Sequence, residues 1–128
     1  FFKENKISAE IIDLISISPL DMNTIIKSVK KTGKLIIFDT CHKSFSTGKE
    51  IISNLIESNK NIFKKEPILL GMPNTPTPTG FSLTKEYYPS KEDLANSIAK
   101  ILDIKKFNTN SIPKILEHDK PKEFVGPF

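Results

Sequence analysis

Three residue types are absent or nearly absent from this 128-residue sequence: it has no arginine, no tryptophan and a single cysteine, Cys41. One thiol excludes an internal disulfide framework and is typical of a reducing compartment, so we expect a cytoplasmic protein. No apolar run approaches the roughly 18 residues that a membrane-spanning helix requires, and we expect no membrane partner. The first residues also lack the basic and then apolar pattern of a secretory signal.

The charge balance is basic, with a formal net charge of +4 and a pI near 9.1. The basic residues are all lysines, spread along the chain with acidic residues nearby. Arginine is the side chain most used to read guanine and to bind phosphate in a bidentate manner. Its absence argues against a nucleic-acid partner. Hydrophobic residues make up 38% and charged residues 27% of the chain, as expected for one folded domain.

The first half of the chain predicts a strand, a helix and a second strand. Residues 7–14 are rich in isoleucine and predict a strand. Asp21 is suited to cap a helix that ends at Gly33, where glycine favours the left-handed terminating conformation. Residues 35–38 form a short continuous apolar run, which predicts a strand buried on both faces.

The second half continues the alternation. We expect a helix from Gly48, a strand at residues 68–70, and a last helix begun by a capping box of Ser90 and Asp93. The prolines of residues 73–78 exclude a helix or an interior strand between them. The pattern predicts an α/β fold, a three-layer α/β/α arrangement with a mainly parallel sheet, over residues 1–104. Residues 105–128 are expected to be an extension that packs on the domain or on a partner subunit.

The residues with chemical potential do not form a complete catalytic set. Cys41 and His42 follow a predicted strand, but neighbours on an extended chain point to opposite sides. We predict no catalytic role for Cys41, and for His42 an interface or loop role stands as the alternative to ordinary packing. Gly48 precedes a lysine as in a phosphate-binding loop, yet the other glycine and the following serine or threonine of that motif are missing. The backbone N–H groups of a helix start at Gly48 remain a candidate anion site, and no metal site is expected.

Several short motifs follow one another along most of the chain. They are Pro19-Leu20-Asp21, Lys31-Thr32-Gly33, Phe38-Asp39-Thr40, the proline-rich residues 71–79, Tyr87-Tyr88-Pro89 and the ending Gly126-Pro127-Phe128. Together they resemble the transketolase C-terminal domain, in the form found in 2-oxoacid dehydrogenase beta subunits. The sequence departs from that family at Ile15 and Ser18, where arginines are usual, and residues 46–48 keep only one glycine of a glycine-rich helix entry.

The resemblance implies a non-catalytic assembly domain of a thiamine-diphosphate-dependent dehydrogenase or transketolase-like enzyme. Thiamine diphosphate and a divalent metal would then bind outside this chain. The implied partners are a second copy, in a homodimer, or an alpha-type subunit in a heterotetramer, with docking to an acyltransferase core. The family's domain begins with a strand and a helix that we expect upstream of Phe1. A free-standing module that kept this fold and binds a small anion or a partner protein is the alternative.

Overall fold

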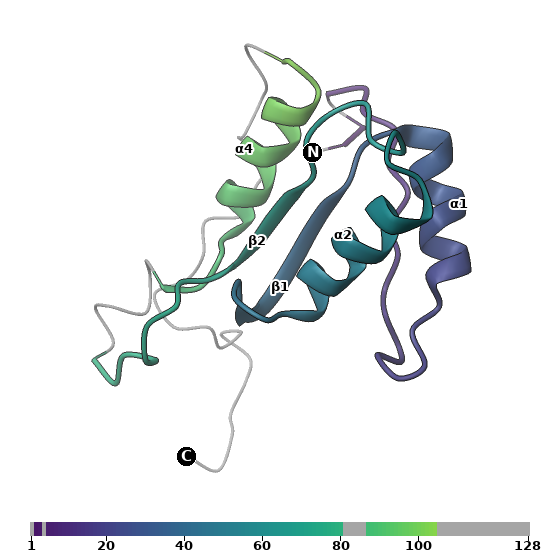
Figure 1. Ribbon diagram of the computed structural model, residues 1–128. Coiled ribbons are helices and arrows are strands. Elements are labelled where there is room, and N and C mark those ends of the chain that lie inside the picture. The colour runs from purple at the N-terminus through teal and green to yellow at the C-terminus, as the bar shows by residue number, and fades with distance from the viewer. Residues whose placement is uncertain (1, 4, 81–86, 105–128) are drawn as a thin grey trace.

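The computed structural model of the chain describes residues 2–3, 5–80 and 87–104 (Figure 1). Its elements are α1 (Met22–Thr32), β1 (Ile36–His42), α2 (Thr47–Ser58), β2 (Ile68–Met72) and α4 (Lys91–Ile101). The two strands are parallel neighbours, with Ile36 opposite Ile68 and Phe38 opposite Leu70. Helix α2 makes the crossover that parallel strands require. The predicted α/β class with a parallel sheet is therefore confirmed.

Helix α1 begins and ends at the residues that the sequence indicated. The carboxylate of Asp21 accepts a hydrogen bond from the Thr24 backbone N–H at 3.1 Å. At the other end Gly33 has a φ of 68°, and its N–H donates to the carbonyl of Val29. A glycine adopts this left-handed conformation without the steric cost of a Cβ atom.

The main core lies between the sheet, α1 and α2. Its buried members are Ile25, Val29, Ile51, Leu55 and Ile62. Leu55 is completely inaccessible to solvent. The helical spacing of the apolar residues in each helix places them on one face, as predicted.

The sheet separates this core from α4. Ile37 and Leu69 are paired in register, and both side chains lie against Gly48 of α2. Because successive strand residues point to opposite faces, the next pair, Phe38 and Leu70, faces the other side. Helix α4 contacts both strands, and its buried residues are not members of the α1–α2 cluster. The described part of the chain thus has α1 and α2 on one side of the sheet and α4 on the other (Figure 1).

Two expectations for the strands are wrong. Residues 7–14 form no strand, and Ile11 is 82% exposed. A strand is stabilised by hydrogen bonds to a neighbouring strand, and the described residues place no other strand beside this segment. The second error concerns β1, which is not buried on both faces, because Phe38 is 44% exposed.

The capping box of α4 is present as predicted. The Ser90 hydroxyl accepts a hydrogen bond from the Asp93 N–H at 3.1 Å, and the Asp93 carboxylate accepts one from the Ser90 N–H at 2.7 Å. The predicted extension, residues 105–128, lies outside the described residues. No helix among the residues described is long and apolar enough to cross a membrane.

Candidate functional site

His42 lies at the end of β1 and contacts the proline-rich segment that follows β2. Its Nδ1 atom is 2.6 Å from the carbonyl oxygen of Pro73. A carbonyl can only accept, so Nδ1 carries the hydrogen and donates it. The imidazole also meets the ring of Tyr87 edge-on, with the ring centroids 6.4 Å apart.

Tyr87 is a second anchor of the same segment, and the sequence analysis missed its role. The side chain is buried, and its hydroxyl donates to the carbonyl of Thr75 at 2.8 Å. The hydroxyls of Tyr87 and Thr77 are 3.3 Å apart. His42 and Tyr87 together hold a segment whose prolines lack the N–H groups needed to join the sheet. An aromatic residue just before a helix cap was the available signal.

Cys41 is next to His42 but has a different environment. The thiol is exposed, and the backbone N–H of Cys41 donates to the Asp39 carboxylate at 3.1 Å. A hydrogen bond to Asp39 and the negative charge of that carboxylate raise the pKa of the Cys41 thiol. Because the thiolate is the nucleophilic form, this environment makes the thiol less reactive at neutral pH.

Gly48 lies in the first turn of α2 and faces the sheet. A Cβ atom at this position would be 2.6 Å from Leu69 Cδ1 and 3.1 Å from Ile37 Cγ2. Glycine therefore allows the start of the helix to approach the strands closely. The nearby Lys49 N–H donates to the Ser46 hydroxyl at 3.3 Å. Anion binding at this helix start stays a prediction, as does an interface role for His42.

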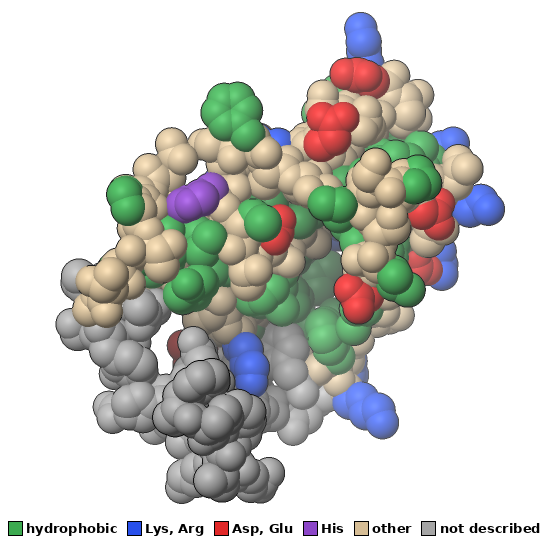
Figure 2. Space-filling model, turned by 90° about the horizontal axis from the view of Figure 1, so that it is seen from below, with side chains coloured by type: hydrophobic (Ala, Val, Ile, Leu, Met, Phe, Trp, Pro, Cys, Tyr) green, Lys and Arg blue, Asp and Glu red, His purple; other side chains and the backbone are tan. Residues whose placement is uncertain are grey.

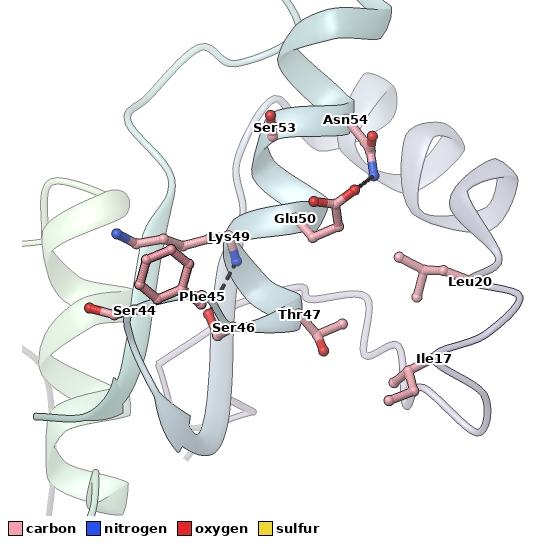
Figure 3. A pocket seen from close by; sticks show the side chains of 10 residues that line it. All are labelled: Ile17, Leu20, Ser44, Phe45, Ser46, Thr47, Lys49, Glu50, Ser53 and Asn54. Carbon is pink, nitrogen blue, oxygen red and sulfur yellow. Dashed lines mark hydrogen bonds between the residues drawn. The ribbon is translucent and has the colours of Figure 1, made fainter. Parts of the chain in front are cut away.

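A hollow opens beside the start of α2 (Figure 3). It has a volume of about 720 Å³ and is open to solvent. Residues of α2 and the loop before it form one wall, and Ile17 and Leu20 form the opposite one. The full lining is Ile17, Leu20, Ser44, Phe45, Ser46, Thr47, Lys49, Glu50, Ser53 and Asn54. This mixture of hydroxyl, amide, apolar and charged groups is typical of a contact surface rather than of an enclosed ligand pocket.

Figure 2 views the molecule from below, the end toward which both strands run. Apolar side chains reach the surface there beside a histidine, and acidic side chains gather toward one side. Fully or largely exposed apolar side chains of the chain include Ile15 and Phe45.

Within the described ranges, no three His, Cys, Asp or Glu side chains converge as metal ligands. These residues therefore offer no cluster that fits the divalent metal of a diphosphate cofactor.

Comparison with known proteins gives the family. A profile described as transketolase, C-terminal domain, matches residues 2–94. The chain belongs to the transketolase C-terminal domain family. It is 36% identical over 104 residues to the mitochondrial pyruvate dehydrogenase E1 component subunit beta of Saccharomyces cerevisiae, covering 80% of this chain and 28% of that protein.

Two further relatives carry related names. The pyruvate dehydrogenase E1 component subunit beta of Rickettsia bellii is 31% identical over 80% of this chain and 32% of its own length. The acetoin:2,6-dichlorophenolindophenol oxidoreductase subunit beta of Cupriavidus necator is 31% identical over 75% of this chain and 28% of its own length. This chain thus spans about a third or less of the length of these relatives.

Proposed function

We propose that this transketolase C-terminal domain is the assembly domain of a thiamine-diphosphate-dependent 2-oxoacid dehydrogenase beta subunit or of a transketolase-like enzyme. The observation that carries the proposal is the family match over residues 2–94 together with relatives named as E1 beta subunits. In this proposal the domain contributes to subunit pairing and to docking, and the catalytic groups belong to other domains.

The surface of the domain supports a role in assembly. Ile15 is 99% exposed, and Ile11, Ile17 and Phe45 are also exposed. Ile17 and Phe45 line the same hollow, and exposed apolar side chains that share one patch mark contact sites with other proteins. We propose pairing with a second copy or within a heterotetramer that includes an alpha-type subunit, and docking to an acyltransferase core.

Thiamine diphosphate and its divalent metal are proposed to bind outside this chain. The described residues contain no converging group of metal-ligating side chains, and the hollow beside α2 is open. The cytoplasmic location also stays a prediction, since the relatives include a protein named as mitochondrial.

Calorimetry tests the proposed division of labour. Thiamine diphosphate with Mg²⁺ is titrated into the 128-residue chain and, separately, into the native polypeptide purified with its partner subunit. We expect saturable binding by the native assembly and no heat of binding with the chain alone. Binding to the chain with a Kd in the ~1 μM range, about −8 kcal/mol, would place the cofactor site within it and contradict the proposal.

A further inference from the structure

We draw no further inference here: the strongest candidate, the exposed apolar surface of β1 around Phe38 on the α4 side of the sheet, carries nothing because no feature of the described residues shows what covers it.

Discussion

At the scale of single residues, two glycines show how closely the backbone is packed. A Cβ atom on Gly48 would meet Leu69 Cδ1 at 2.6 Å, which is the movable end of a side chain. A Cβ atom on Gly71 would meet the backbone carbonyl oxygen of Cys41 at 2.8 Å. The neighbouring side chain can shift in the first case, whereas the second requires the two strands to move.

We therefore expect the two alanine substitutions to differ. Gly71→Ala should lower the free energy of unfolding by about 2–3 kcal/mol. Gly48→Ala should lower it by only about 1 kcal/mol, because alanine recovers part of the loss through its higher helix propensity. Urea unfolding of the chain measures both, with Ser53→Ala on the exposed side of α2 as the control. A larger loss for Gly48→Ala would contradict the contacts described at these positions.

At the scale of secondary-structure elements, the start of α4 depends on a charged carboxylate. Hydrogen bonds from the Ser90 side chain and backbone lower the pKa of Asp93. A carboxyl group whose pKa is lower in the folded state stabilises the fold above its unfolded pKa of about 4. That contribution is lost as the pH falls through the lower folded value.

The expected outcome is a weaker acid dependence in a capping variant. Asp93→Asn should reduce stability at neutral pH and flatten the decline in stability below about pH 4. Thermal unfolding from pH 7 to acidic pH measures this, and Glu92→Gln in the same turn but outside the capping box is the matched control. An unchanged acid dependence in Asp93→Asn would show that the cap carboxylate does not contribute.

The elements also show what the sequence could predict. Both helix caps, at Asp21 and Ser90, follow from interactions between residues three apart, and local chemistry was enough to locate them. The strand expected at residues 7–14 depended on a neighbouring strand, which no local pattern supplies. The exposure of Phe38 has the same origin, because burial of a strand depends on what covers its face.

The candidate site was less predictable than the fold. The contact between His42 and Pro73 joins residues 31 positions apart, and the hollow brings Ile17 beside residues of α2. Spacing along the sequence carries no information on such contacts. The contacts of His42 with Pro73 and Tyr87 lie within this chain, so the interface role of His42 stays a prediction.

At the scale of the whole molecule, we propose that this transketolase C-terminal domain functions as part of a larger beta-subunit polypeptide. The relatives support this proposal, since the chain covers 28% to 32% of the lengths of those compared. The exposed apolar residues Ile15 and Phe45 support it as well, because assembly would remove them from water.

The size of the native polypeptide tests this proposal. An antibody raised against the chain is used in an immunoblot of the source cells, with the purified 14.4 kDa chain as the size marker. We predict a band large enough to include at least one further domain of roughly 100–200 residues. A single band at 14.4 kDa would contradict the proposal and favour the free-standing binding module.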